Sequence, residues 1–240
     1  MSTNKKLVII AVCLLGAGLL VSGFAFAAMG FDFSKMGNQK MVTNEFEITE
    51  SFKNISISGD TEDIKFVRAT DGKCKVVCYE NEEELHDVTV TTGTLAIEEK
   101  HHRIWHFGFS SDVPTITLYL PDAQYETIRI DTDTGDSDIN DLKCRDFYLD
   151  TDTGDVFLKN VIASGEYHME LDTGDVMFDK SDAKALFVET DTGDIRGTLL
   201  SDKVFLTESD TGDINVPKAI TGGRCELTTD TGDIDISIVK

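Results

Sequence analysis

The second half of the chain alternates apolar or small residues with polar ones in six similar segments. The first segment shows the pattern, because Ile128, Ile130 and Thr132 are separated by charged residues and a new alternation runs from Ser137 to Ile139. Alternation with a period of two predicts a β-strand that buries one face. Each segment therefore predicts two short strands, with a break between them where the alternation restarts.

The break is the tetrapeptide Asp-Thr-Gly-Asp, which occurs six times at intervals of 19, 20, 19, 19 and 20 residues. Its glycine allows a bend that a residue with a Cβ atom would resist. A period this regular indicates one small structural unit that is stacked on itself. The aspartates of the six copies are Asp133, Asp136, Asp152, Asp155, Asp172, Asp175, Asp191, Asp194, Asp210, Asp213, Asp230 and Asp233.

A unit of two short strands cannot bury its own apolar face, but parallel stacking in register makes a continuous core. The sequence thus predicts an all-β protein built as a single-stranded parallel β-solenoid (β-helix), right-handed because parallel crossovers almost always are. About six regular rungs of 19 to 20 residues fill residues 128–240 in chain order. Residues 44–127 show less regular strand patterns that we expect to begin or cap the stack, and Ser58–Ile64 is similar to a degenerate rung.

Stacking brings equivalent aspartates to about 4.8 Å from one another, the distance between neighbouring strands. Two such charges repel by about 0.9 kcal/mol in water, so the column needs compensation. The carboxylates can accept hydrogen bonds from turn amides, face water and salt, or hold a hard cation such as Ca²⁺. We expect turn-forming aspartates and no cofactor, and we keep a Ca²⁺ site formed by the twelve aspartates as the alternative.

The N-terminal residues predict export. Residues 1–6 are a short basic cytoplasmic start, and residues 7–28 are uncharged, mostly apolar and long enough for one transmembrane helix. Residues 29–43 are expected to be a linker. This makes the chain a single-pass membrane protein, with residues 44–240 as its extracytoplasmic domain. The alternative is a cleaved signal peptide ending near Ala25-Phe26-Ala27, which would give a secreted protein.

The net charge of the chain limits the classes of partner that it can bind. The chain has 44 acidic and 22 basic residues and a formal net charge of −22. Such a balance disfavours nucleic acid and anionic lipid headgroups as partners. It favours cations, basic proteins or neutral glycans.

A run of histidine and aromatic residues before Val113-Pro114 is a second candidate contact site. Three histidines within six residues could bind a transition metal, and aromatic residues often anchor protein partners. His86 and His168 have no evident partners, and the five cysteines lack zinc or redox spacing, so we expect mostly buried free thiols. The residues of the run are His101, His102, Trp105, His106, Phe107 and Phe109.

Three known uses of similar residues fit this chain poorly. Aspartic proteases use Asp-Thr-Gly, but they need two copies that face each other and share a proton, whereas six copies would stack in one column here. A lyase of the pectate-lyase type needs a basic residue beside its Ca²⁺, and no arginine column accompanies the repeat. The Thr-x-Thr pairs of some ice-binding β-helices face outward, but the first threonine here shares the parity of the buried columns.

The repeats resemble those of exported bacterial proteins known as the "putative adhesin" family, which carry a domain of unknown function. Thr117-Leu118-Tyr119-Leu120-Pro121 leads into a strand, and Gly193-Asp194-Ile195, Gly212-Asp213-Ile214 and Gly232-Asp233-Ile234 follow. The resemblance covers roughly residue 44 to the end. It implies a β-solenoid on the bacterial cell surface and supplies no catalytic residues. One departure is Thr with Asp where many members have Ser-Ser, which makes this column more acidic.

The sequence predicts a membrane-anchored cell-surface interaction module that resembles an adhesin and is not an enzyme. Its partner would be a surface protein, a glycan or a membrane partner protein. The alternative is an extracytoplasmic structural or sensory part of a membrane complex in envelope homeostasis. A polysaccharide-active β-helix enzyme is the third reading, and it would need a catalytic cluster away from the repeat columns.

Overall fold

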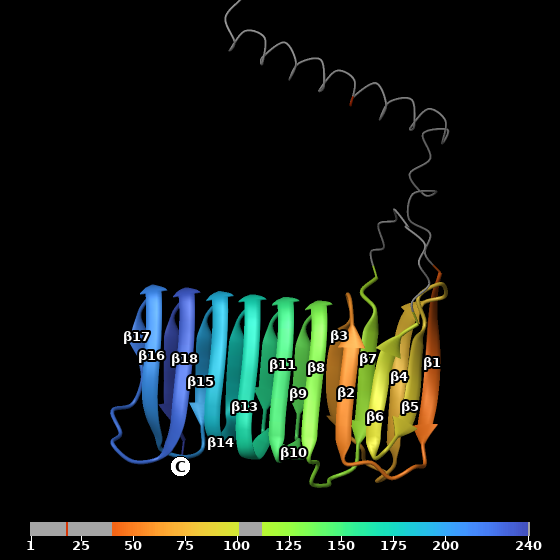
Figure 1. The fold of residues 1–240 in the computed structure, drawn as a ribbon, viewed down its shortest axis with the longest axis horizontal. Helices are drawn as coiled ribbons and strands as arrows, with labels where there is room; N and C mark the ends of the chain where they lie inside the picture. Colours follow the sequence, from red (N-terminus) through yellow and green to blue (C-terminus); the bar gives the residue numbers. More distant parts are fainter. Residues whose placement is uncertain (1–17, 19–39, 101–111, 240) are drawn as a thin grey trace, which may run out of the picture. The chain divides into compact units, whose positions relative to one another are not determined.

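The computed structural model describes Gly18, residues 40–100 and residues 112–239. The described residues of the solenoid domain form nineteen strands (Figure 1), so the all-β expectation is confirmed. In this part of the chain, no helix has the length and apolar character needed to cross a bilayer. Residues 7–28 and the candidate run from His101 to Phe109 lie outside the described residues, and the expectations for them stay predictions.

Two sheets face each other across the core. The strands before each tetrapeptide form what we call the pre-turn sheet: β8 (Thr127–Thr134), β11 (Asp146–Thr153), β13 (Ile162–Thr173), the second half of β14 (Val176–Thr192), β16 (Lys203–Thr211) and β18 (Gly223–Thr231). The strands after it form the post-turn sheet: β9 (Ser137–Asn140), β12 (Val156–Lys159), the first half of β14, β15 (Ile195–Leu199), β17 (Ile214–Asn215) and β19 (Ile234–Ile238). The short β10 (Lys143–Cys144) pairs with β13.

The repeats pair parallel and in register, as a solenoid requires. Leu149 of β11 lies opposite Ile130 of β8 on one side and Met169 of β13 on the other, and all three are buried. The first threonine of the Thr-x-Thr pairs is buried too, at Thr132, Thr151, Thr190 and Thr229. The predicted inward columns are therefore the core of the domain.

The rungs do not stack in chain order, which corrects the expectation of a sequential stack. Strand β18 pairs with β14 on one side and β16 on the other, and β19 lies likewise between β15 and β17. A polar residue at one of the core positions gives a physical reason for this order. Thr207 of β16 stands where the other copies have aliphatic residues or Met, and it is only half-buried, whereas Leu227 of β18 is fully buried. The rung with the least apolar core face occupies the end, where less of it is enclosed.

The irregular N-terminal part continues the stack at the other end. Strands β2 (Asn54–Gly59) and β3 (Asp63–Arg68) pair parallel with β8 and β9, so the degenerate rung predicted at Ser58–Ile64 is confirmed. Strands β6 (Thr94–Glu99) and β7 (Thr115–Leu120) pair next to them. The last strands, β1 (Met41–Ile48), β4 (Cys74–Asn81) and β5 (His86–Thr91), pair antiparallel and cover this end.

The turn glycines lie against one another from rung to rung. Gly154 has a φ of +152°, and a Cβ atom built on it would lie 2.0 Å from the carbonyl oxygen of Gly135 in the neighbouring rung. Its amide donates to Thr173 O of the rung on the other side at 2.9 Å. Any side chain at this position would therefore separate the rungs as well as strain the backbone.

We expect Gly154→Ala to lower the free energy of unfolding by roughly 3 kcal/mol or more, because backbone atoms of the adjacent turn cannot move aside. Gly72→Ala is the matched control, since Gly72 has a φ of +72° but no atom within 4 Å of its Cβ position. It should cost only about 1–2 kcal/mol of backbone strain. Urea unfolding of both variants checks this, and equal losses would contradict the role of turn packing.

Candidate functional site

The second aspartate of each tetrapeptide takes part in a relay of hydrogen bonds along the stack. Asp155 N donates to Asp136 Oδ1 at 2.9 Å, Asp175 N to Asp155 Oδ1 at 2.9 Å, and Asp194 N to Asp175 Oδ1 at 2.8 Å. The relay follows the spatial order of the rungs: Asp233 N donates to Asp194 Oδ1 at 2.6 Å and Asp213 N to Asp233 Oδ1 at 2.9 Å. Each of the five accepting carboxylates thus compensates the amide of the next turn, as turn-forming aspartates should, and Asp213 ends the relay.

The first aspartate of each tetrapeptide is exposed at all six positions: Asp133, Asp152, Asp172, Asp191, Asp210 and Asp230. Partial loss of hydration and the neighbouring carboxylates, Asp60 first among them, raise the pKa of Asp133. The pKa of Asp233, in the relay column, is lowered by the amide of Asp213 and by Arg196. The two columns therefore differ in what compensates their charge, and Ca²⁺ binding along them stays a prediction.

We expect Asp175→Ala to destabilise the domain by about 1 kcal/mol, because the amide of Asp194 loses its acceptor. Asp172→Ala is the matched control on the same turn. It removes an exposed charge from a repelling column, so it should change the free energy of unfolding by no more than about 0.5 kcal/mol. Urea unfolding at constant ionic strength compares the two, and a larger loss at Asp172 would refute the division of roles between the columns.

The outer face of the pre-turn sheet carries a stripe of neighbouring aromatic and cationic side chains, whose rings are tilted against one another. The Arg129 guanidinium lies 4.8 Å from the centre of the Tyr148 ring, which lies 6.2 Å from the ring of His168. The His168 ring lies 6.1 Å from that of Phe187, and Arg224 covers Phe187 at 5.4 Å. We call these five residues the aromatic stripe. It crosses five neighbouring strands, one residue to a strand.

A shallow hollow of about 340 Å³ lies along the stripe and is lined by Arg129, Tyr148, Leu149, Asp150, His168 and Glu170. His168 Nε2 lies 2.9 Å from Glu170 Oε1, so this histidine has a partner two residues away on the same strand face. Burial and the neighbouring acidic residues raise the pKa of Asp150. Sequence reasoning missed the stripe because it followed the inward columns, although four of its members stand at the position four before the first aspartate.

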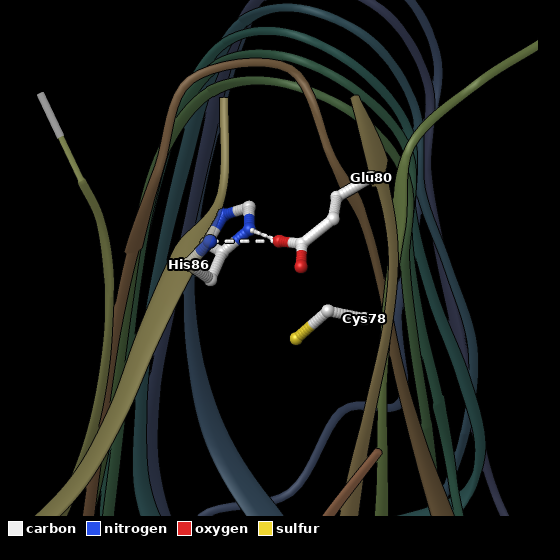
Figure 2. A group of neighbouring side chains, drawn as sticks. All are labelled: Cys78, Glu80 and His86. Carbon is white, nitrogen blue, oxygen red and sulfur yellow. Dashed lines mark hydrogen bonds and ion pairs between the residues drawn. The ribbon is translucent and has the colours of Figure 1, made fainter. Parts of the chain in front are cut away.

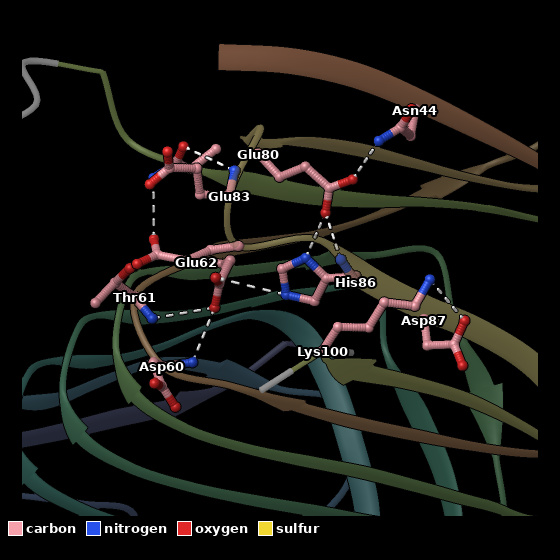
Figure 3. Close-up of polar contacts among 11 residues, drawn as sticks. Asn44, Asp60, Thr61, Glu62, Glu80, Glu83, His86, Asp87 and Lys100 are labelled. Atoms are coloured by element: carbon pink, nitrogen blue, oxygen red, sulfur yellow. Dashed lines mark hydrogen bonds and ion pairs between the residues drawn. The ribbon is translucent and has the colours of Figure 1, made fainter. Parts of the chain in front are cut away.

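A second group of polar side chains is buried in the N-terminal part. His86, at the start of β5, lies between two carboxylates: Glu80 Oε2 is 2.7 Å from its Nδ1, and Glu62 Oε1 is 3.5 Å from its Nε2 (Figure 3). All three side chains are buried. The expectation that His86 has no partner is therefore wrong, because its partners come from β4 and from the turn between β2 and β3, which the sequence does not bring together.

Further contacts hold both carboxylates in place. Glu80 Oε2 also accepts from the backbone N–H of His86 at 2.7 Å, and Glu80 Oε1 accepts from Asn44 at 2.6 Å. Glu62 Oε2 accepts from the amides of Asp60 at 2.9 Å and Thr61 at 3.0 Å. Glu62 thus serves the turn of the degenerate rung and faces His86 at the same time.

Cys78 completes the group from the same strand as Glu80 (Figure 2). One donor atom each from Cys78, Glu80 and His86 lie within 4.8 Å of one another. Burial, and then Glu80 and Glu62, raise the pKa of the Cys78 thiol to about 12. Cys74, Cys144 and Cys225 are also buried free thiols, which confirms that expectation for the four described cysteines.

Glu99, on β6, adds a carboxylate whose Oε2 is buried without a hydrogen-bond partner among the described residues. Its pKa is raised to about 7 by burial, by a hydrogen bond with Asp60, and by the charges of Asp60, Glu62 and Glu84. The proton that Glu99 takes up is thus held by the folded protein at a pH where the unfolded chain has lost it.

The protonated form of Glu99 stabilises the fold below its unfolded pKa of 4.5, and this contribution is lost as the pH rises through about 7. We therefore expect metal-free protein to lose stability between these two pH values, and Glu99→Gln to lose less of it. Glu98→Gln, on the exposed outer side of the same strand, is the control and should follow the wild type. Thermal unfolding across this range in EDTA measures the difference, and identical profiles for all three proteins would contradict it.

Comparisons with known proteins agree with this architecture. The family model described as Toastrack DUF4097 matches residues 52–240. The structure of a "putative adhesin" from Bacteroides fragilis is 18% identical, with a TM-score of 0.48, over 83% of this chain and 98% of that chain. A "putative cell adhesion protein" from Clostridium sporogenes is 13% identical, with a TM-score of 0.50, over 83% of this chain and 100% of the other.

At such identities the likeness of the Clostridium sporogenes structure bears on the fold alone. None of the curated proteins compared with this chain matches it. The family model, in contrast, spans the degenerate rung, all six tetrapeptides and the strands between them. The resemblance drawn from the Gly-Asp-Ile repeats is thereby confirmed, and the chain belongs to the Toastrack DUF4097 family.

Proposed function

We propose that this protein is an adhesin-like interaction module held at the bacterial cell membrane by residues 7–28, and that it binds glycans through the aromatic stripe. The observation that carries the proposal is the continuous series of side-chain contacts on the outer face of the pre-turn sheet, formed by Arg129, Tyr148, His168, Phe187 and Arg224. The solved structures described as adhesion proteins are consistent with a surface role.

The stripe has the chemistry that a sugar chain needs. The apolar face of a sugar ring packs on aromatic rings such as Tyr148 and Phe187, which lie half-buried on the sheet. Asp150 and Glu170 line the hollow beside them and can accept hydrogen bonds from sugar hydroxyls. A neutral glycan also avoids the repulsion that the net charge of −22 imposes on acidic partners.

The backbone supplies preorganisation. Each stripe residue stands on a different strand, and neighbouring strands lie about 4.8 Å apart, close to the length of one sugar unit in an extended chain. The strands are fixed by parallel pairing on both sides at β11, β13 and the second half of β14. Little conformational entropy remains to be lost when a ligand binds. Binding of this kind makes and breaks no covalent bond, and we propose no catalysis.

The test uses the full chain in mild detergent and immobilised cello-, malto- and N-acetylchito-oligosaccharides. We expect one of these probes to bind, and Tyr148→Ala or Phe187→Ala to weaken binding at least about tenfold, because each removes a stacking face. Met177→Ala is the control, since Met177 is an exposed apolar residue of the post-turn sheet. No binding to any of the three, or equal losses in the control, would overturn the proposal.

A further inference from the structure

The buried group at Cys78, Glu80 and His86 offers one sulfur, one oxygen and one nitrogen donor within 4.8 Å of one another (Figure 2). In a tetrahedral zinc site with bonds of 2.0–2.3 Å, ligand atoms lie about 3.5 Å apart. Small side-chain rotations would bring the three donors to that separation. Mixed sulfur, nitrogen and oxygen ligands suit zinc better than they suit Ca²⁺ or Mg²⁺, which prefer oxygen alone.

The charges of this group are not balanced by the described residues. Glu62 and Glu80 are both buried, and the ion pairs described for them are both with His86. A protonated His86 supplies one positive charge for two carboxylates, and Glu99 adds a third acidic group nearby. Burying an uncompensated charge is costly, so a dication would stabilise the group.

An unpartnered atom points to a ligand independently of the charge. The His86 side chain is only 1% exposed, and its Nε2 has no hydrogen-bond partner among the described residues. If Nδ1–H donates to Glu80, then Nε2 carries a lone pair that faces the Glu62 carboxylate at 3.5 Å, and two such acceptors repel each other. If Nδ1 instead binds an ion shared with Cys78 and Glu80, the ring proton moves to Nε2, from which it can be donated to Glu62.

The backbone holds these side chains in one place. Cys78 and Glu80 are two residues apart and both lie on the inner side of β4. Strand β4 pairs with β1 on one side and β7 on the other. The backbone amide of His86 is bound to Glu80, which fixes the start of β5 beside β4. The donors therefore come from a rigid sheet and not from a mobile loop, as a preformed metal site requires.

We propose that Cys78, Glu80 and His86 bind a transition-metal dication, with Zn²⁺ the ion that best suits the donors and Glu62 the neighbouring carboxylate that completes the charge. The ion would join β4 to β5 and so stabilise the N-terminal cap of the solenoid. The site is independent of the aromatic stripe and of the proposed glycan binding.

Binding must release a proton. A cysteine thiol such as that of Cys78 is mostly protonated at neutral pH, and only the thiolate binds zinc. When the zinc–sulfur bond forms, this proton passes to the solvent. Affinity should therefore rise with pH, and calorimetry in buffers of different ionisation enthalpy should detect the released proton.

The experiment titrates the full chain, freed of metal with EDTA and then desalted, with ZnCl₂ in a calorimeter. We expect one equivalent to bind with proton release and to raise the unfolding temperature, and neither Mg²⁺ nor Ca²⁺ to compete. Cys78→Ser and His86→Gln should each weaken binding at least about 100-fold. Cys144→Ser is the control, since Cys144 is equally buried, has a pKa of about 12 and lies in β10.

Cobalt binding gives a second measurement if a variant proves unstable. A thiolate-to-cobalt absorption band should appear in the wild type and in Cys144→Ser, and it should be absent in Cys78→Ser. A combined variant of His101, His102 and His106 should still bind the equivalent of zinc. The proposal is overturned if the wild type binds no zinc, or if binding is unchanged in Cys78→Ser and His86→Gln.

Discussion

The close approach of the turns is the constraint on which the regular solenoid depends. Where Gly154 lies against Gly135, the missing side chains let one backbone meet the next. The same approach brings the amide of each turn within reach of an aspartate on its neighbour, as between Asp155 and Asp136. Glycine and aspartate therefore recur together because one permits the contact and the other satisfies the amide that the contact brings close.

This arrangement explains how so acidic a chain tolerates stacked carboxylates. In the relay each carboxylate accepts an N–H, whose dipole offsets part of its charge, and the remainder faces solvent. The buried group at His86 is different, because Glu62 and Glu80 share one imidazole away from water. Acidic residues thus accept backbone amides in both parts of the domain, and Glu62 and Glu80 share one imidazole in addition.

Much of the fold could be predicted from the sequence because equivalent positions of a repeat adopt the same local structure and stack on one another. The parity of Ile128, Ile130 and Thr132 gave the buried face, and the tetrapeptide gave the turn. The order of the last rungs could not be predicted from spacing, since rungs of equal length fit any neighbour. It depends on how apolar the core positions of each rung are, as the half-buried Thr207 and the fully buried Leu227 illustrate.

The candidate sites were harder to predict, for two different reasons. The aromatic stripe was present in the sequence as a column of outward positions, but the predictions rested on the inward columns that form the core. The group at His86 had no local signature, because Cys78 and Glu80 meet His86 and Glu62 only through the pairing of separate strands. Non-repetitive segments carry no register, so their contacts depend on the tertiary fold.

The insertion of β18 and β19 inside the stack has a consequence for how the chain reaches its native state. Until these strands are available, β14 lacks its neighbour on that side and β16 has no strand with which to pair. The solenoid therefore cannot be completed by adding rungs one after another as the chain emerges from the ribosome. The rung next to its end closes last, and β16 and β17 must wait for strands made after them.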